Sequence, residues 1–394
     1  MLLGLVGKPS AGKSTFFKAA TLAEVAIASY PFTTIKPNHG VGYVKVDCID
    51  RELGVQCNPN HGFCIRGKRF VPVELMDVAG LVPGASEGKG LGNRFLDDLR
   101  QADVFIHIVD TSGTTDSEGK PTENYNPEKD ILFLELELDK WYYNLLVKAW
   151  KSFARKVEIE DTSFSEAVAK QFSGLKVTEN QVKTTLLKAN LPGKPSAWNE
   201  IQLMQFASAL RKESKPTIIA ANKVDTAKGR ENYDSIRVKF PHLIIIPCSA
   251  DSELALREAA KSELIKYIPG ETDFKITGKL NEKQTGALEN IREKVLDKFD
   301  TGTGVQEVLN YAVFNLLEYL AIFPASATKL KDSKGRTLPD CFLLPPGSTA
   351  LDFAYFLHTD FGNNFIKAID ARTKRILGKN YELKNRDALE IVTK

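Results

Sequence analysis

Cysteine is scarce in this chain of 394 residues, and its five cysteines are odd in number. A disulfide framework is built from paired cysteines, usually in a short chain, so the sequence indicates a reducing compartment. Long hydrophobic runs are also lacking: the first apolar run covers only residues 2–6, and no later one approaches the length of a membrane span. We therefore predict a cytoplasmic protein.

A strong charge of either sign is absent as well, because the formal net charge is only +3. The field of the whole molecule therefore does not select a polyanionic partner, and any surface for nucleic acid must be local. What the chain has is an ordinary globular composition, with 43% hydrophobic and 26% charged residues. Its length predicts two or three domains.

The stretch from Gly7 to Thr15 fits the phosphate-binding pattern GxxxxGKS and follows the apolar residues 2–6, which predict a buried strand. Lys13 would bring positive charge to the terminal phosphates of a nucleotide, and the Ser14 hydroxyl would bind Mg²⁺. The helix that follows would turn its N-terminal N–H groups towards the same anion. The candidate nucleotide-binding residues here are Gly7, Ser10, Ala11, Gly12, Lys13, Ser14 and Thr15.

Two further patterns predict the parts of a nucleotide-dependent switch. Thr33 and Thr34 follow Pro31 and offer hydroxyls for Mg²⁺ and the γ-phosphate, although a threonine-rich turn into a strand would explain them too. Asp77 ends the apolar stretch 70–76 and opens a DxxG pattern. Its carboxylate could hold Mg²⁺ through water, and the Gly80 N–H could contact the γ-phosphate.

A fourth pattern predicts guanine recognition. The apolar stretch 217–221 ends in Asn222-Lys223-Val224-Asp225, an NKxD pattern. The Asp225 carboxylate could accept hydrogen bonds from N1–H and the 2-amino group of guanine, two donors that adenine lacks. Asn222 could tie this loop to the phosphate loop, the Lys223 stem could cover the base, and the backbone at Ser249 and Ala250 could meet the guanine O6. All four patterns follow apolar strands in an order that suits an open α/β sheet.

The rest of the chain predicts the domain organisation. We expect an α/β nucleotide-binding domain with a mostly parallel sheet in residues 1–128 and 215–270, interrupted by a helical insertion at 129–214. A helical connector at 271–321 and a small β-rich domain at 322–394 would follow. We interpret the aromatic stripe of Trp141, Tyr142 and Trp150 as the core of the insertion rather than a partner surface. Residues 112–127 predict a long exposed loop.

Two local clusters allow more than one interpretation. Cys57-x3-His61-x2-Cys64, with Cys48 upstream, could bind zinc, but the spacing is irregular and lacks a CxxC pair. We interpret this segment as a solvated loop with reduced thiols, with zinc as the alternative. Residues 322–394 hold 12 Lys plus Arg against 8 Asp plus Glu, and the run 372–375 could contact a phosphate backbone or form a solvated turn.

Several stretches resemble the Obg-like GTPase family, in particular its YchF-type branch, the Obg-like ATPases. They are Tyr30-Pro31-Phe32-Thr33-Thr34, Asp77 to Ala85, and Gly88 to Asn93. The C-terminal Pro346 to Ala354 followed by His358-Thr359-Asp360 resembles a TGS domain, a ubiquitin-like β-grasp module shared with some RNA-associated proteins. The resemblance covers essentially the whole chain and implies a nucleotide-hydrolysing translation or stress factor that touches the ribosome.

Departures from the family pattern shape the functional hypothesis. The chain keeps Asp225 where the YchF-type branch commonly ends in Glu and prefers ATP, which favours GTP. Ser10 replaces the family Asn that is associated with a bound K⁺, and Ser86 stands where the branch often has its proposed water-positioning His. Leu81 replaces the Gln of Ras-like enzymes, so no side chain is an obvious catalytic group and we expect slow turnover.

We therefore predict a Mg²⁺-dependent GTP-binding and GTP-hydrolysing switch, with Lys13 and Gly80 acting at the γ-phosphate and Ser14, Thr33, Thr34 and Asp77 at the metal. Expected partners are GTP or GDP and a ribosomal or other RNA–protein surface, with no membrane. An ATPase, or a nucleotide-gated scaffold with little hydrolysis, is the alternative.

Overall fold

The computed structural model describes residues 1–22, 38–78, 99–148, 150–326, 330–332 and 334–394. Within these residues, the central sheet follows the strand order β2-β4-β1-β5-β6-β7, with β3 paired to β4. Strands β1, β4, β5, β6 and β7 run parallel, while β2 and β3 are antiparallel to β4. The strands are β1 (Leu2–Val6), β2 (His39–Asp47), β3 (Phe63–Ile65), β4 (Lys68–Asp77), β5 (Val104–Asp110), β6 (Thr217–Asn222) and β7 (Ile245–Cys248).

Helices cover both faces of this sheet, as continuous apolar parallel strands require. On one face, α1 (Lys13–Thr21), α9 (Ala250–Lys261) and α11 (Val305–Tyr311) share a core with β1, β4 and β5. On the other face, α3 (Glu128–Val147) packs through Leu134 and Leu138, and α8 (Ala227–Lys239) packs through Tyr233 and Ile236. This doubly wound arrangement is the predicted P-loop fold, and it places the ends of β1, β4, β5 and β6 along one edge.

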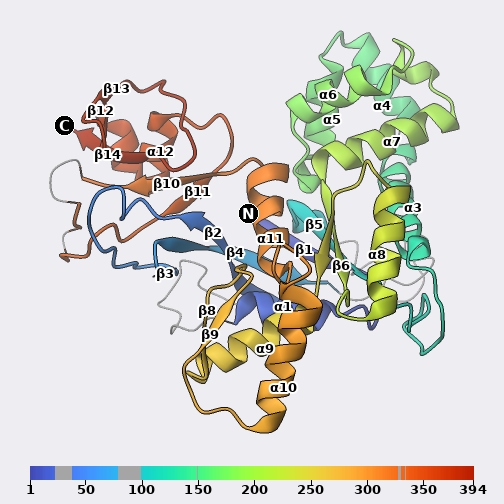
Figure 1. Cartoon of the computed structure of the whole chain (residues 1–394). Helices are drawn as coiled ribbons and strands as arrows, with labels where there is room; N and C mark the ends of the chain where they lie inside the picture. Colours follow the sequence, from blue (N-terminus) through green and yellow to red (C-terminus); the bar gives the residue numbers. More distant parts are fainter. Residues whose placement is uncertain (23–37, 79–98, 149, 327–329, 333) are drawn as a thin grey trace.

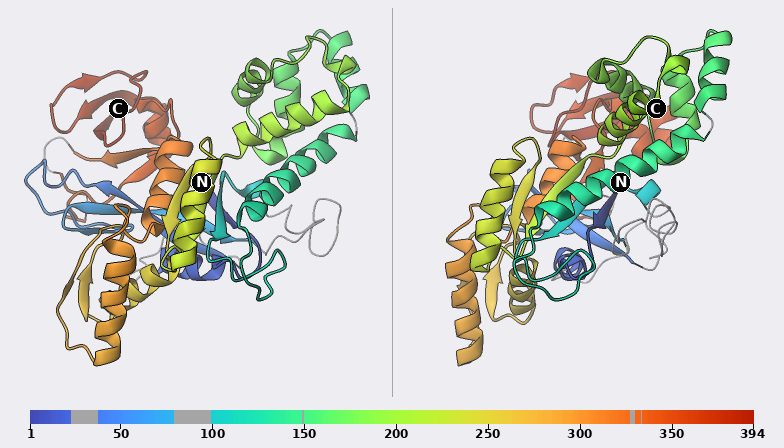
Figure 2. Two further views of the ribbon diagram at one scale, coloured as in Figure 1. Left: turned by 45° about the vertical axis from the view of Figure 1, so that its right-hand side comes forward. Right: turned by 90° about the vertical axis from the view of Figure 1, so that its right-hand side faces the viewer.

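The chain between β5 and β6 forms the helical insertion, which projects away from the sheet (Figure 2). A stacked pair, Trp150 and Trp198 with ring centroids 5.4 Å apart, anchors its aromatic core. Trp141, Tyr142 and Trp150 are all buried, so their interpretation as core is confirmed. The apolar spacing from Ile131 to Phe153 falls on two helices, α3 and the helix after it, with residue 149 between them outside the described residues. The helices and short 3₁₀ turns after α3 are α4 (Trp150–Ile159), α5 (Phe164–Gln171), η2 (Ser173–Leu175), α6 (Glu179–Ala189), η3 (Pro195–Ala197) and α7 (Glu200–Ser214).

After α9, a short hairpin and a helical connector lead to the C-terminal domain. The hairpin packs against α9 and α10 through Ile265, Tyr267 and Leu288, and the sequence patterns did not predict it. Two of the helices below, α10 and α11, each continue into a short π-helical segment, in which the backbone turn is wider. The elements are β8 (Ile265–Tyr267), β9 (Phe274–Ile276), α10 (Glu282–Ile291), η4 (Arg292–Leu296) and, after α11, η5 (Ala312–Leu316).

The C-terminal domain is a five-stranded mixed sheet in the order β11-β10-β14-β12-β13, with a helix packed on it through Phe353. Parallel pairing of its first and last long strands, β10 and β14, gives the β-grasp arrangement expected of a TGS domain. The predicted boundary at residue 322 falls inside β10. The elements are β10 (Leu320–Pro324), β11 (Phe342–Leu344), α12 (Ala350–Leu357), α13 (Thr359–Asn363), β12 (Phe365–Asp370), β13 (Ile376–Leu377) and β14 (Ala388–Thr393).

Figure 1 shows the C-terminal domain beside β2 and β3 at the left, and the helical insertion at the upper right, beyond β5 and β6. The connector helix α11 lies between them and contacts β2. Among the described residues, no helix is long and apolar enough to cross a bilayer.

Candidate functional site

The phosphate loop between β1 and α1 depends on a close approach to the NKxD segment. Gly12 has φ of 97°, a left-handed conformation, and a Cβ atom added there would lie 2.3 Å from Asn222 Nδ2. Only glycine fits both constraints. Helix α1 begins directly afterwards with no side-chain cap on its N-terminal N–H groups. These N–H groups and the helix dipole form the kind of site that binds phosphate.

Lys13 lies buried beneath this loop, where its ammonium donates to the carbonyl oxygens of Gly7 at 3.0 Å and Lys8 at 2.7 Å. Burial lowers its pKa to about 8, and the neighbouring Asp77 carboxylate opposes that shift. A buried cation of this kind gains most from an anionic ligand. Lys13 is therefore positioned to bind phosphate oxygens.

Ser14 and Asp77, predicted to share a metal, lie side by side. The Ser14 hydroxyl donates to Asp77 Oδ2 at 3.2 Å, across the ends of α1 and β4. Burial raises the pKa of Asp77, although the Ser14 hydrogen bond and the charge of Lys13 both lower it. Two hard oxygen ligands at the phosphate loop suit Mg²⁺.

The NKxD segment is bonded directly to the phosphate loop. Asn222 donates from Nδ2 to the Ala11 carbonyl at 3.0 Å and accepts at Oδ1 from the Ala250 N–H at 3.0 Å. Asp225 accepts a hydrogen bond from the Ser249 hydroxyl at 2.8 Å, which fixes the carboxylate beside the β7–α9 turn. A carboxylate has about four acceptor positions, so this bond leaves Asp225 free to accept two more donors.

Lys223 adds a second link between the NKxD segment and the phosphate loop. It also contacts Asp110, a residue that the sequence motifs did not predict. Its ammonium donates to Ser10 O at 3.2 Å and to Asp110 Oδ2 at 2.8 Å. Asp110 is fully buried at the end of β5 and also accepts from the hydroxyls of Ser112 and Thr115. These bonds, with that from Lys223, hold the pKa of Asp110 below its usual range against the opposing effect of burial. Its position directly after an apolar strand was the signal that could have found it.

A buried ion pair connects the phosphate loop to the helical insertion. Lys8 Nζ lies 2.9 Å from Asp130 Oδ2, and both side chains are almost fully buried. The Tyr125 hydroxyl donates to the other Asp130 oxygen at 2.8 Å, and the Tyr125 ring lies 4.1 Å from Lys8 Nζ. No sequence pattern predicts this pair, because its partners lie far apart in the chain.

The segment before α3 therefore differs from the exposed loop predicted at 112–127. Thr111, Ser112 and Gly113 are buried, and Lys8 donates to the Thr115 carbonyl at 2.7 Å. Gly119 approaches Pro9 so closely that an added Cβ would lie 2.8 Å from the Pro9 carbonyl oxygen. The exposed-loop prediction is wrong for the part of this segment that packs over the phosphate loop.

Several predicted site residues cannot be placed. Thr33, Thr34 and Gly80 lie outside the described residues, as do Leu81 and Ser86, the positions compared with water-orienting side chains. The other candidates are described and lie together at one edge of the sheet. Ser14 is exposed at the start of α1, and Thr15 beside it is half-buried.

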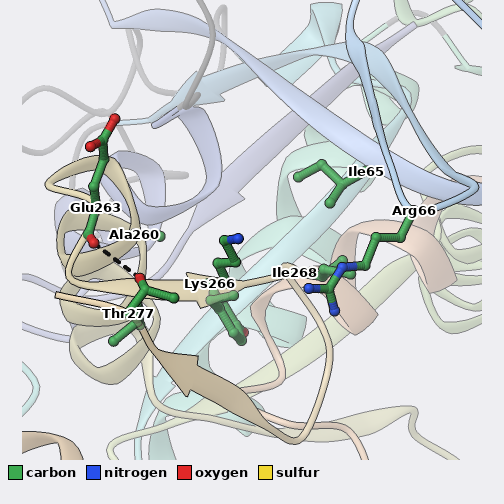
Figure 3. A pocket seen from close by; sticks show the side chains of 9 residues that line it. Ile65, Arg66, Ala260, Glu263, Lys266, Ile268 and Thr277 are labelled. Atoms are coloured by element: carbon green, nitrogen blue, oxygen red, sulfur yellow. Dashed lines mark hydrogen bonds between the residues drawn. The ribbon is translucent and has the colours of Figure 1, made fainter.

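Two pockets differ in their relation to these motifs. The pocket in Figure 3, about 630 Å³, lies between the β3–β4 turn and the β8–β9 hairpin, where Arg66 faces Ile268. None of the motif residues line it. A second pocket of about 460 Å³ includes Asp225 and is lined further by Arg230, Lys294 and Lys298. Only the second pocket adjoins the candidate nucleotide site.

Comparison with known proteins places these features in a family. Residues 2–138 match the family described as 50S ribosome-binding GTPase, residues 220–326 match the Obg-like GTPase YGR210-like, G4 motif-containing domain, and residues 330–393 match the TGS domain. An uncharacterized GTP-binding protein of Methanocaldococcus jannaschii is 47% identical over 100% of this chain and 99% of its own length.

More distant relatives show the same architecture. A ribosome-binding ATPase YchF of Bacillus subtilis is 27% identical over 93% of this chain and 87% of its own length. The crystal structure of a GTP-binding protein from Pyrococcus horikoshii OT3 matches with a TM-score of 0.79 at 41% identity, covering 100% of both chains. The Schizosaccharomyces pombe YchF GTPase shares the fold, with a TM-score of 0.58 at 20% identity over 100% of this chain and 97% of its own. This chain, with its P-loop G domain and TGS domain, belongs to the Obg-like GTPase family.

Proposed function

We propose that this protein is a Mg²⁺-dependent switch that binds and slowly hydrolyses GTP and acts at the ribosome. The observation that carries the proposal is the bridge through Asn222, which joins Ala11 of the phosphate loop to Ala250. Through this bridge, a ligand on the phosphate loop and a base beside Asp225 would occupy one continuous site.

Guanine is favoured over adenine by the way Asp225 is held. The Ser249 hydroxyl anchors one carboxylate oxygen and leaves acceptor positions for the N1–H and 2-amino donors of guanine. Adenine offers neither donor, so it would leave the carboxylate without those bonds. The relatives named as ATPases make ATP the rival substrate.

Mg²⁺ fits the oxygens at the phosphate loop. Ser14 and Asp77 are within hydrogen-bond distance of each other, and the half-buried Asp77 carboxylate would be stabilised by a cation. Thr33 and Thr34 remain candidate ligands from the segment that precedes β2. When bound, Mg²⁺ would offset the charge of the phosphate oxygens.

Lys13 and the Gly80 N–H would act at the γ-phosphate, the first by stabilising charge and the second by sensing its presence. No side chain among the described residues at the site is a candidate to orient the attacking water. Slow intrinsic turnover is therefore expected, with a partner or a K⁺ ion near Ser10 completing the site.

Two features favour a ribosomal partner and a cytoplasmic location. Relatives across most of this chain are named ribosome-binding ATPases, and the first 138 residues match a family of ribosome-binding GTPases. The C-terminal TGS domain carries the local excess of basic residues. Within the run 372–375, however, Arg372 pairs with Glu52, so it is less available for RNA than the sequence suggested.

Calorimetric titration of GTP, GDP, ATP and ADP into nucleotide-free protein with Mg²⁺ tests the base assignment. Guanine nucleotides should bind far more tightly than adenine nucleotides. Equal or tighter ATP binding would overturn the GTP assignment and favour an ATPase. Single-turnover assays with and without K⁺ and ribosomes then test hydrolysis, and a protein inert in every condition would be a nucleotide-gated scaffold.

Asp225→Asn sharpens the same titration. Replacing one carboxylate oxygen by an amide removes a charged acceptor, so GTP affinity should fall by about 1.5–3 kcal/mol while ATP affinity changes little. Asp161→Asn, at an exposed carboxylate between α4 and α5 of the helical insertion, is the matched control and should bind GTP as the wild type does. An unchanged GTP affinity in Asp225→Asn would mean that other residues read the base.

A further inference from the structure

The loop between β2 and β4, residues 48–67, folds around three thiols and a carboxylate. Cys48, Cys57 and Asp50 are buried, and Cys64 is half-buried at the start of the hairpin with β4. One ligand atom from each of these four residues lies within 4.8 Å of all the others. The predicted solvated loop is therefore wrong for these grouped side chains, although the cysteines are free thiols as predicted. His61, the other predicted ligand, is not in the group and contacts Asn60 Nδ2 at 3.0 Å.

The distances within this group are those of ligands around one ion. The sulfur atoms of Cys48 and Cys57 are 3.7 Å apart, and Cys64 Sγ lies 3.9 Å from Asp50 Oδ2. Two sulfurs that each bind a tetrahedral zinc at about 2.3 Å are about 3.8 Å apart. A disulfide would need about 2.05 Å. The separation therefore matches shared coordination and not a covalent bond.

A buried cation next to the group calls for negative charge. Arg69 is fully buried and pairs directly with Cys64 in the β3–β4 ladder. Its guanidinium donates to the carbonyl oxygens of Leu338 and Pro339, and among the described residues it forms no ion pair with a carboxylate. A buried charge without compensation is costly. Three thiolates, one carboxylate and Zn²⁺ would carry a net charge of −2 and provide that compensation.

We propose that Cys48, Asp50, Cys57 and Cys64 form a structural zinc site that holds this loop in the shape on which the C-terminal domain docks. Three soft thiolates with a carboxylate within 4.8 Å of each of them favour Zn²⁺ over the harder Mg²⁺ or Ca²⁺. All four positions are filled by the protein, which is typical of structural and not catalytic zinc.

The docking contacts explain what the site would stabilise. The Asn58 N–H donates to the Thr337 carbonyl at 2.8 Å, and the Asn60 N–H donates to the Pro339 carbonyl at 2.7 Å. Both donors lie between the ligands Cys57 and Cys64, so a bound ion would fix their positions. Figure 1 shows β2, which leads into this loop, and β3, which lies within it, next to the C-terminal domain.

Metal analysis of the full-length protein by mass spectrometry, after dialysis against metal-free buffer, tests the site. We expect about one zinc ion per chain, as one set of four ligands requires. Cys57→Ser and Cys64→Ser should lose it, whereas Cys248→Ser, at a buried cysteine outside the group, should keep it. No zinc in the wild type, iron in its place, or unchanged zinc in both variants would overturn the proposal.

Two more variants test the fourth ligand. Cys341, a buried thiol from the C-terminal side, belongs to the same buried core as Cys48 and Cys57. Asp50→Asn should weaken zinc binding more than Cys341→Ser does. The opposite order would overturn Asp50 as the ligand.

If the cysteine variants fail to fold, Co²⁺ added to the metal-free wild type gives an independent measurement. Intense thiolate-to-cobalt absorption is expected, and its absence would overturn the site.

Hydrogen exchange tests the docking role. Removing zinc from the wild type should speed amide exchange in peptides covering residues 48–67 and 334–341, because Asn58 and Asn60 would lose fixed partners. Exchange in β6, on the far side of the sheet, should be unchanged. If zinc removal left amide exchange at residues 48–67 unchanged, the metal would not hold the docking loop, and the proposed docking role would be overturned.

Discussion

The helical insertion and the C-terminal domain are attached to the same sheet in contrasting ways. The insertion begins at the nucleotide site, where Asp130 of α3 pairs with Lys8 of the phosphate loop in a buried contact of 2.9 Å. The C-terminal domain rests on the loop 48–67, where Glu52 forms partly exposed pairs with Arg372 and Arg386. The ion pair of the insertion is buried, whereas the two ion pairs of Glu52 are partly exposed.

The ladder between β2 and β4 separates these two regions. At one end His39 pairs with Met76, next to Asp77 of the candidate metal site. At the other end Asp47 pairs with Lys68, beside the docking loop. A shift in the phosphate loop would thus reach the insertion directly through the Lys8–Asp130 pair, whereas Glu52 and its partners lie at the far end of the β2–β4 ladder. We infer that the insertion responds more directly to the bound nucleotide.

The largest expected effect comes from removing Lys8. Lys8→Met leaves Asp130 buried without its cation, which should lower the free energy of unfolding by about 3–5 kcal/mol. Urea unfolding followed by tryptophan fluorescence measures this, because Trp141, Trp150 and Trp198 are the chain's three tryptophans and all lie in the insertion.

Two variants control this measurement. Lys120→Met, which removes the cation of the exposed pair with Glu118, should leave unfolding unchanged. Lys8→Met/Asp130→Leu should recover most of the loss, since an apolar pair can replace a buried ion pair. A Lys8→Met variant as stable as the wild type would contradict a buried link between phosphate loop and insertion.

An intermediate effect is expected at Lys13, whose pKa is lowered from 10.5 to about 8 by burial. At pH 9 the free protein carries Lys13 mostly neutral, and a bound triphosphate would raise its pKa again. Nucleotide binding should then take up close to one proton. Raising the pKa of Lys13 back towards its ordinary value corresponds to roughly 3 kcal/mol of free energy. Calorimetry in buffers of different ionisation enthalpy measures this uptake. Lys13→Met should abolish it, and uptake that persists in the variant would assign the proton elsewhere.

The smallest effect is expected at Glu52, where the pairs with Arg372 and Arg386 are partly exposed to solvent. Glu52→Gln should cost no more than about 1 kcal/mol and should lose that difference in high salt. Thermal unfolding at low and high ionic strength checks this, with Glu118→Gln as the exposed control. A larger loss of stability that does not depend on salt would contradict this expectation. It would mean that the docking of the C-terminal domain depends on a single charge, as we expect for the insertion.

The sequence predicted the elements whose signal is local. The apolar strands before Gly7, Asp77 and Asn222 end where expected, because parallel strands buried on both faces are continuous apolar runs. The TGS fold followed from a resemblance. By contrast, Lys8 and Asp130 pair across 122 positions, and nothing in either neighbourhood marks the contact.

Irregular spacing left the cysteine group undecided, with zinc only as the alternative interpretation. Asp50 belongs to no motif, and Cys48 joins Cys57 and Cys64 only because β2 and β4 bring the ends of their loop together. Strand β13, with two residues, is too short for any periodic pattern to show. Contacts set by tertiary structure were therefore the ones that sequence reasoning missed.

The distance along the chain between Arg69 and its carbonyl partner at Leu338 has a consequence for synthesis. These residues are 269 positions apart, whereas Cys48, Asp50, Cys57 and Cys64 lie within a single short loop. As the chain is made from its N-terminus, the loop is complete long before residues 337–339 exist. The surface that receives the C-terminal domain is thus available first, and docking is a late, long-range step in folding.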